Sequence, residues 1–210
     1  MSEITRSGRR DPREWRQRLR EEPYLIIPGL CAALRGWWYK FWLPLSGRRF
    51  KAGARLRVYG PLTISGPGRV EFGNDCLIIS NAIRPVCIRT LTPSAQVTLG
   101  DHGGLNGTSI QCLERVEIES LSNIADAYIS DTAAHVLDAD RRRRSAMEAA
   151  HAPVHIRKNV WISVQVVVLH GVTIGEHSVI GACSLVRDDV PARVFAAGNP
   201  LRIIRDIPGA

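Results

Sequence analysis

Aliphatic residues recur at every sixth position over the last third of the chain. From residue 156 the sequence reads IRKNVW, ISVQVV, VLHGVT, IGEHSV, IGACSL and VRDDVP, so that each block begins with Ile or Val. Each block also has a small or β-branched residue at its fifth position. A period of six is neither the 3.6 of an α-helix nor the 2 of a plain strand. It predicts short strands separated by turns, with one side chain of each strand pointing inward and three blocks closing one triangular coil.

The same repeat runs through residues 55–131 with interruptions. The positions that keep the frame are Val58, Ile64, Val70, Leu99, Leu105, Ile118 and Ile124. The frame slips around residues 76–88, which predicts loops at the corners of the coils. Residues 132–153 break the repeat altogether and predict a loop that extrudes from the solenoid, with a short helical patch at SAMEAA. Such loops on a rigid scaffold often carry function.

Residues 1–54 precede the repeat and have a helical pattern. A charged helix is expected over residues 11–22, capped by Asp11. A second helix would place seven apolar residues on one face, namely Leu30, Leu34, Trp37, Trp38, Phe41, Trp42 and Leu45. One interpretation of residues 24–45 is a cap over the open end of the solenoid. The alternative is an interfacial helix that makes a peripheral contact with a membrane.

The C-terminal repeats also resemble a known family. The stretch NVWISVQVVVLHGVTIGEHSVIGACSLVRDDVPARVFAAGNPLRIIR is similar to the C-terminal signature of the maltose/galactoside and polysaccharide O-acetyltransferase group of hexapeptide-repeat acyltransferases. The resemblance covers roughly residues 55–207 and is most specific after Asp131. It implies an all-β fold, a left-handed parallel β-helix over residues 55–131 and 154–198, with 132–153 as the active-site loop and 199–210 as a C-terminal tail. It also implies acetyl-CoA as co-substrate, no metal, and a homotrimer.

The segment ISDTAAHVLDADRRRR resembles the catalytic stretch of that family. In this alignment His135 takes the place of the catalytic base, and imidazole suits that role because its pKa lies near neutrality. Asp131 would orient the ring or bind the acceptor, although it would serve equally well as a corner residue. Trp161 would line the site, and Asn106 is a candidate for binding hydroxyl groups of the acceptor.

The family binds the pantetheine arm of the donor between neighbouring subunits, against small residues of the last coils. The matching positions are Ser163, Val164, Gly181 and Ala182, with Arg187, Arg202 and Arg205 as candidates for the coenzyme phosphates. Two departures are present. First, Ser163 and Val164 replace smaller family residues, which narrows the space for the pantetheine arm. Second, the family has a Thr-Lys pair before an aspartate, where this chain has Arg187 before Asp188.

The stretch VLHGVTIG also resembles the zinc-binding segment of γ-class carbonic anhydrases, which share this fold. Those enzymes have a second histidine five residues before the position of His170, where this chain has Gln165. A set of three histidine ligands is therefore not visible, and no metal is expected.

Composition restricts the partners further. The formal net charge is +8 and the pI about 9.8, with seven arginines in residues 1–20 and a run at 141–144. No nucleic-acid-binding motif accompanies these charges, so no nucleic-acid partner is expected. Five cysteines without a C-x-x-C pair fit a reducing compartment. With no apolar signal core, these features predict a cytoplasmic protein, or one peripheral at the inner face of the membrane.

The function that these features predict is O-acetylation of a sugar hydroxyl. The acceptor would be a surface polysaccharide or its nucleotide- or lipid-linked precursor, and the histidine base would assist direct attack on acetyl-CoA. Two alternatives stay open. One is an N-acetyltransferase acting on an amino sugar, and the other is a non-catalytic β-helix scaffold.

Overall fold

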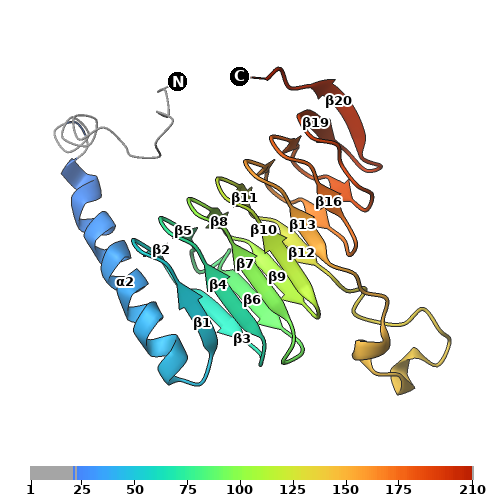
Figure 1. Cartoon of the computed structure of the whole chain (residues 1–210), viewed down its shortest axis with the longest axis horizontal. Coiled ribbons are helices and arrows are strands. Elements are labelled where there is room, and N and C mark those ends of the chain that lie inside the picture. Colours follow the sequence, from blue (N-terminus) through green and yellow to red (C-terminus); the bar gives the residue numbers. More distant parts are fainter. Residues whose placement is uncertain (1–20, 22, 210) are drawn as a thin grey trace.

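The chain forms a parallel β-helix with three sheets, described by a computed structural model for residues 21 and 23–209. Figure 1 shows the coils stacked along one axis, with a helix at the N-terminal end and a loop projecting from the middle. Sheet A contains β1 (Arg49–Ala52), β4 (Arg69–Phe72), β7 (Gln96–Leu99), β10 (Arg115–Ile118), β13 (Val154–Ile156) and β16 (Thr173–Ile174). The predicted all-β solenoid is therefore confirmed.

Sheets B and C complete the triangle. Sheet B contains β2 (Arg57–Tyr59), β5 (Leu77–Ile79), β8 (Gly104–Asn106), β11 (Asn123–Ala125), β14 (Trp161–Ile162), β17 (Val179–Ile180), β19 (Val194–Ala197) and β20 (Arg202–Asp206). Sheet C contains β3 (Leu62–Ser65), β6 (Val86–Thr90), β9 (Ser109–Cys112), β12 (Tyr128–Ser130), β15 (Val167–Val168) and β18 (Leu185–Val186). All strand pairs are parallel except β19 with β20.

The repeated aliphatic positions form the core, as the six-residue period predicts. Every anchor identified from the sequence is at most 8% exposed, and the six between residues 156 and 186 are fully buried. In the C-terminal coils each strand has two residues, the first half-buried or exposed and the second buried. A single inward side chain from each strand thus fills the interior of the triangle.

The sheets meet at three edges, which we name by the sheets they join. The A/B edge includes residues 157–160 and 175–178, and the B/C edge includes 163–166 and 181–184. The C/A edge includes 169–172 and 187–190, and the extruded loop leaves from it, because the loop connects β12 to β13. Many turns contain a residue with positive φ, such as Asn159 (56°) and His177 (62°) on the A/B edge.

The β-helix extends further at both ends than the sequence indicated. β1 begins at Arg49 and pairs with β4, although the repeat was expected to start at residue 55. Its inward residue is Phe50, which packs edge-on against Phe72 with ring centroids 5.3 Å apart. An aromatic anchor of this kind is missed by a search for aliphatic positions. The expected tail also contains a strand, β20, which turns back along β19.

In the described part of the chain, three short 3-10 helices and one α-helix lie outside the sheets. α2 (Ile26–Leu45) follows η1 (Pro23–Leu25) and lies across the first coil (Figure 1). Its contacts are made by a narrow face on which Ala32, Gly36 and Leu43 are buried. A Cβ at Gly36 would collide with the Leu56 carbonyl oxygen, so glycine allows the helix to approach the coil. η2 (Arg141–Arg143) and η3 (Ala146–Glu148) lie in the extruded loop.

The helix covers the end of the solenoid with its narrow buried face, and its apolar face is exposed. Two hydrogen bonds help to fix it, from the Leu62 amide to the Tyr39 hydroxyl (3.0 Å) and from Lys40 Nζ to the Gly53 carbonyl (2.8 Å). The seven apolar residues that the sequence placed on one face are all exposed. Among the described residues, no helix is long and apolar enough to cross a membrane. The charged helix expected over 11–22 lies outside the described residues, apart from Glu21.

Candidate active site

The extruded loop is closed at its base by backbone hydrogen bonds. Thr132 forms an antiparallel bridge with His151, and the amide of Ala133 donates to the carbonyl of Ala150 at 2.8 Å. The amide of Ala152 donates to the carbonyl of Asp131 at 3.0 Å. The two ends of the loop are therefore held together where they leave the C/A edge, and the loop projects from a fixed point (Figure 1).

Asp131 belongs to the fold and not to the solvent-facing part of the loop. Its side chain is fully buried, and its carboxylate accepts three backbone amide hydrogen bonds, from Leu113 (2.7 Å), Glu114 (2.7 Å) and Arg115 (2.8 Å). The Cys112 thiol donates to it at 3.4 Å. Both carboxylate oxygens are thus engaged with the turn before β10. This agrees with the alternative that Asp131 is a corner residue, and not with a role in orienting His135.

The thiol beside this carboxylate is chemically inert. Burial raises the pKa of Cys112, and the neighbouring Asp131 charge raises it further. The thiol therefore stays protonated and acts as a hydrogen-bond donor to the carboxylate, which excludes Cys112 as a nucleophile.

His135 lies on the exposed surface of the loop. Ala134 has a positive φ of 63°, and the His135 amide donates to the Ala133 carbonyl at 2.8 Å, so the chain turns sharply just before the imidazole. Within the described part of the chain, the ring makes no hydrogen bond. Its two nitrogens are therefore free to contact a ligand or a second subunit.

Two hydroxyl residues that the sequence did not single out hold this turn. The Ser130 hydroxyl donates to the Thr132 carbonyl at 2.8 Å, and the Thr132 hydroxyl accepts from the Ala134 amide at 3.1 Å. Such local contacts are typical of Ser and Thr near turns. The signal was present in the sequence as a Ser and a Thr flanking the acidic residue.

The rest of the loop contains two ion pairs, both made by one arginine. Arg144 is paired with Glu148 (2.6 Å) and Asp138 (3.1 Å), and the hydrogen bond from Arg144 lowers the pKa of the Glu148 carboxyl. This arginine, one of the run at 141–144, is therefore already engaged within the loop.

The candidate donor residues lie along the B/C edge. Strand register places Asn106 beside Ala125, and the same row continues through Ser163, Gly181 and Ala197 to Arg202. Successive strands lie about 4.8 Å apart, so the five steps from Asn106 to Arg202 span roughly 24 Å. The neighbouring Val164 and Ala182 are exposed on the same edge. The structure thus assembles most of the predicted donor residues, with Asn106, into one row.

Gly181 is required by packing within the chain as well. A Cβ there would lie 2.8 Å from Cβ of Ala197 and 3.2 Å from the Phe195 ring. The row stays smooth at this point because no side chain can be accommodated.

Two other predicted residues lie on sheet B. Trp161 is 53% exposed and pairs with Val179. Arg205 in β20 pairs with Phe195 and is exposed at the C-terminal end of the same sheet. Both therefore face the same side of the β-helix as the row.

Arg187 does not lie with the other donor residues. It is on the C/A edge, two strands from Ser130 across β15, and its Nε donates to Asp188 at 3.2 Å. Six residues separate it from Gly181, so the two edges are up to roughly 20 Å apart across sheet C. Within one chain, His135 and Arg187 therefore share one edge, and the remaining donor residues share another.

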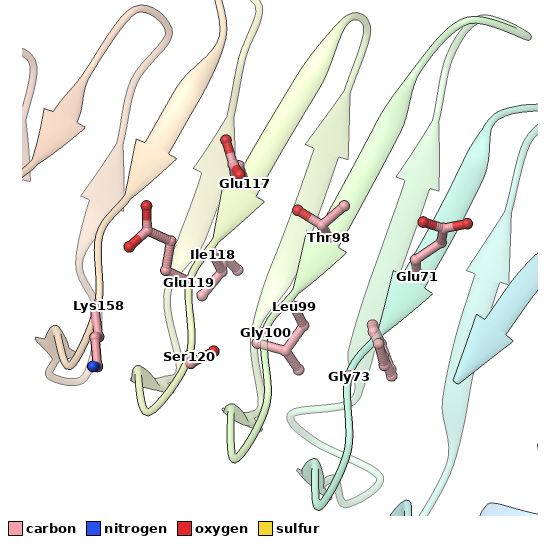
Figure 2. Close-up of a pocket in the computed structure, with 11 residues that line it drawn as sticks. Glu71, Gly73, Thr98, Leu99, Gly100, Glu117, Ile118, Glu119, Ser120 and Lys158 are labelled. Atoms are coloured by element: carbon pink, nitrogen blue, oxygen red, sulfur yellow. The ribbon is translucent and has the colours of Figure 1, made fainter. Parts of the chain in front are cut away.

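A groove on sheet A lies apart from both edges. Its volume is about 630 Å³. Figure 2 shows the carboxylates of Glu71, Glu117 and Glu119 among its lining residues. Its other lining residues are Phe72, Gly73, Thr98, Leu99, Gly100, Ile118, Ser120 and Lys158. None of the predicted site residues lines this groove. Its carboxylates make it unsuitable for the phosphates of a coenzyme.

His170 lies on the C/A edge, in the turn between β15 and β16. Among residues 21 and 23–209, no three His, Cys, Asp or Glu side chains are grouped so that they could hold a metal ion.

Comparison with known proteins agrees with this architecture. The family model described as "Bacterial transferase hexapeptide (six repeats)" matches residues 153–188. These residues are thus similar to the hexapeptide repeats of that family, in the same part of the chain where the six-residue period is strictest. The galactoside O-acetyltransferase of Lactococcus lactis is 47% identical to it over 77 residues, which are 37% of this chain and 36% of that protein. The aligned part thus spans about a third of the length of the curated relatives.

Solved structures resemble a larger part of the chain. A hexapeptide-repeat acetyltransferase of Vibrio cholerae has 25% sequence identity and a TM-score of 0.53, over 72% of this chain and 76% of that one. An N-acyltransferase of Bacillus cereus, solved with dTDP and coenzyme A, has a TM-score of 0.63 at 18% identity, over 79% of this chain and 88% of that one. The second similarity extends to the fold alone.

Proposed function

We propose that this hexapeptide-repeat protein transfers the acetyl group of acetyl-CoA to a sugar hydroxyl, with His135 as the base. The observation that carries the proposal is the position of His135. It is an exposed imidazole without a partner among the described residues, on a loop whose base is closed by hydrogen bonds. The similarity to a galactoside O-acetyltransferase supports both the donor and the class of acceptor.

The reaction needs one proton carrier. The imidazole takes the proton of the acceptor hydroxyl. At the same time the hydroxyl oxygen attacks the thioester carbonyl, and an ester C–O bond forms. The C–S bond then breaks, and the imidazolium returns the proton to the departing thiolate of coenzyme A. No covalent enzyme intermediate is required. An imidazole can carry both transfers because the ring nitrogen that accepts the proton can later donate it.

The site would be formed by two subunits of a homotrimer. The loop with His135 is on the C/A edge, whereas the smooth row from Asn106 to Arg202 is on the B/C edge of the same chain. Rotation of identical prisms about a three-fold axis brings one edge of a subunit against a different edge of its neighbour. The pantetheine arm would lie along the row of one subunit, and the base would come from the loop of the next.

Ser163 and Val164 would then set the width of the donor groove, and Arg202 and Arg205 would contact the coenzyme phosphates. Guanidinium groups suit this role because they form paired hydrogen bonds with phosphate oxygens. Arg187, on the other edge, would reach the donor of the neighbouring subunit. Trp161 and Asn106 would contact the acceptor.

The test is release of free coenzyme A thiol from acetyl-CoA in the presence of a panel of sugars. The panel should contain galactosides, glucosides and the corresponding 2-amino sugars at equal concentration. We expect release that depends on a hydroxyl acceptor, together with an acetyl ester detected by mass spectrometry. Acetylation of the amino sugars alone would show an N-acetyltransferase. No release with any acceptor, although acetyl-CoA binds, would show a scaffold and overturn the proposal.

A further inference from the structure

The outer face of α2 is a continuous apolar and aromatic surface. Nine side chains form this outer stripe, each between 39% and 73% exposed: Ile26, Ile27, Leu30, Leu34, Trp37, Trp38, Phe41, Trp42 and Leu45. At about 100° per residue they cover nearly half of the helix circumference. The buried residues of the helix lie on the opposite side, against the first coil. Because α2 lies against the first coil (Figure 1), the stripe points away from the β-helix.

The stripe is ordered by contacts among its own rings. Trp37 stacks on Phe41 with ring centroids 6.2 Å apart, and Trp38 stacks on Trp42 at 5.7 Å. Soluble proteins rarely leave so large an apolar patch uncovered, and such a patch usually marks a contact surface. An outer partner is therefore required to explain it.

The charge around the stripe identifies that partner. Residues 23–70 contain eight lysines and arginines and no aspartate or glutamate. Residues 1–57 have 14 basic and 5 acidic side chains, whereas residues 58–210 have 14 basic and 15 acidic. The excess positive charge of the protein thus lies entirely in the part of the sequence that contains α2 and the first strands.

Two cations flank the stripe on the helix itself. Arg35 and Lys40 fall on either side of it, between the apolar arc and the buried face. The long side chain of Arg35 can extend to phosphate groups while the aromatic rings enter the interfacial region, whereas Lys40 adds positive charge beside the stripe and donates to the Gly53 carbonyl. Tryptophan is enriched at that depth of a bilayer because its ring is apolar and its N–H is polar.

We propose that the outer stripe docks this protein on an anionic lipid bilayer, with α2 lying in the plane of the interface. The helix has the apolar face, the flanking cations and the tryptophans that interfacial helices use. A second copy of the chain is a poorer partner, because it would bring the same uncompensated cations against each other. The proposal does not depend on the catalytic activity proposed above.

The position of the helix would let several copies of the outer stripe contact one membrane at once. α2 crosses the N-terminal end of the β-helix, and the extruded loop leaves about three strand spacings, roughly 15 Å, from the first coil of sheet C. If the trimer proposed above forms with parallel β-helices, three stripes would face the same plane. Three linked contacts bind a surface far more tightly than one.

The experiment is co-sedimentation of the full chain with vesicles of phosphatidylcholine alone, or with about one third phosphatidylglycerol. We expect sedimentation with the anionic vesicles, weaker sedimentation at high salt, and little with the neutral ones. The variant L34Q/W37Q/F41Q changes three exposed residues of the stripe and should bind at least about tenfold less. The matched control I83Q/L121Q/I204Q changes three exposed apolar residues elsewhere and should bind like wild type.

The electrostatic part has its own pair of variants. R48Q/K51Q removes two exposed cations next to α2, and K158Q/R193Q removes two exposed cations far along the chain. Each cation near an anionic surface contributes about a fivefold change in partitioning, so only the first pair should lower binding substantially. Equal loss in both pairs would show binding by net charge alone and overturn a docked stripe.

A fluorescence measurement covers the case in which the stripe variant fails to fold. The variant W15F/W161F leaves only the three tryptophans of α2. Brominated lipids in anionic vesicles should quench their emission, since the rings would lie within the interface. No sedimentation and no quenching at low salt would overturn the proposal. A change in oligomeric mass in the stripe variant, without vesicle binding by wild type, would instead show that the stripe joins copies of the chain.

Discussion

Two edges of the β-helix differ in what they offer to a ligand. The B/C edge is a row of small and polar positions. At Gly181 the neighbouring atoms leave no space for a side chain. The C/A edge carries the extruded loop, with His135 exposed and Arg187 two strands away from the start of the loop. One edge has the surface on which we propose that the donor lies, and the other carries the imidazole that we propose as the base. Under the proposed function, a complete site therefore takes one edge from each of two chains.

The largest expected effect is on the C/A edge, at the base. His135→Ala should lower turnover by about a hundred- to ten-thousand-fold, because proton transfer from the hydroxyl is lost. Melting temperature and affinity for coenzyme A should be unchanged, since the ring is exposed and makes no hydrogen bond within the described chain. Steady-state thiol release measures the effect. His170→Ala, on the same edge, is the control, and near-normal turnover of the His135 variant would mean that another residue is the base.

On the B/C edge we expect an effect on donor binding. Ala182→Trp places a large ring beside the row and should raise the KM for acetyl-CoA by about tenfold or more, because a small displacement of a reactant is costly. Leu121→Trp makes the same kind of change on the A/B edge and should leave the KM unchanged. An unchanged KM in the Ala182 variant would remove the B/C edge from the donor site.

A smaller effect is expected where the C/A edge is anchored. Asp131→Asn replaces an acceptor of three amide hydrogen bonds by a group that presents one NH2 to those donors. The loss should be about 1–3 kcal/mol of stability, and each kcal/mol lowers Tm by about 2–4 °C in a chain of this size. Thermal melts test it, with exposed Asp188→Asn as control. If the Asp131 variant lost turnover without any change in Tm, a role in catalysis would have to be reconsidered.

The smallest effect concerns cysteine reactivity. Cys183 is exposed on the B/C edge next to Ala182, and Cys31 is exposed on α2. Coenzyme A should slow alkylation of Cys183 at pH 8 and leave that of Cys31 unchanged, which mass spectrometry of the labelled peptides can detect. Protection of both, or of neither, would count against donor binding along this edge.

Buried Cys76 is an internal control for the same labelling experiment, because it should stay unlabelled at pH 8. Burial raises its pKa to about 11. The thiol is therefore neutral at pH 8 and should stay unlabelled in the folded protein. Because the folded pKa exceeds that of the unfolded chain, the associated stability is present below about pH 9 and is lost as the pH rises toward 11. Labelling of Cys76 at pH 8 would show that the first coils open.

The residues of the two edges could not be predicted equally well from the sequence. The strict period after residue 156 predicted the buried anchors correctly, because each short strand has only one inward position and an error of frame would bury a polar residue. From that period, the row through Ser163 and Gly181 follows by counting. Phe50 was missed because the first coil uses an aromatic anchor.

In the extruded loop, counting along the repeat no longer predicts which residues are in contact. Its sequence suggested Asp131 and His135 as partners, but three backbone amides compete successfully for the carboxylate. Nothing in a one-dimensional pattern reveals which amides a turn exposes. The direction of the α2 stripe was also beyond the sequence, because a helix with one apolar and one small-residue face can bury either. Gly36 decides this by allowing close approach on the small-residue side.

The central claim, a site completed by two chains, is tested most directly by mixing two inactive variants. His135→Ala keeps its B/C edge, and Ala182→Trp keeps its loop. Each should be nearly inactive alone at low acetyl-CoA. In trimers assembled from an equal mixture, a random site pairs an intact loop with an intact edge about one time in four. The account predicts recovery of about a quarter of wild-type turnover after co-refolding. If the mixture stays as inactive as its components, although mixed trimers form, then the base and the donor row belong to the same chain.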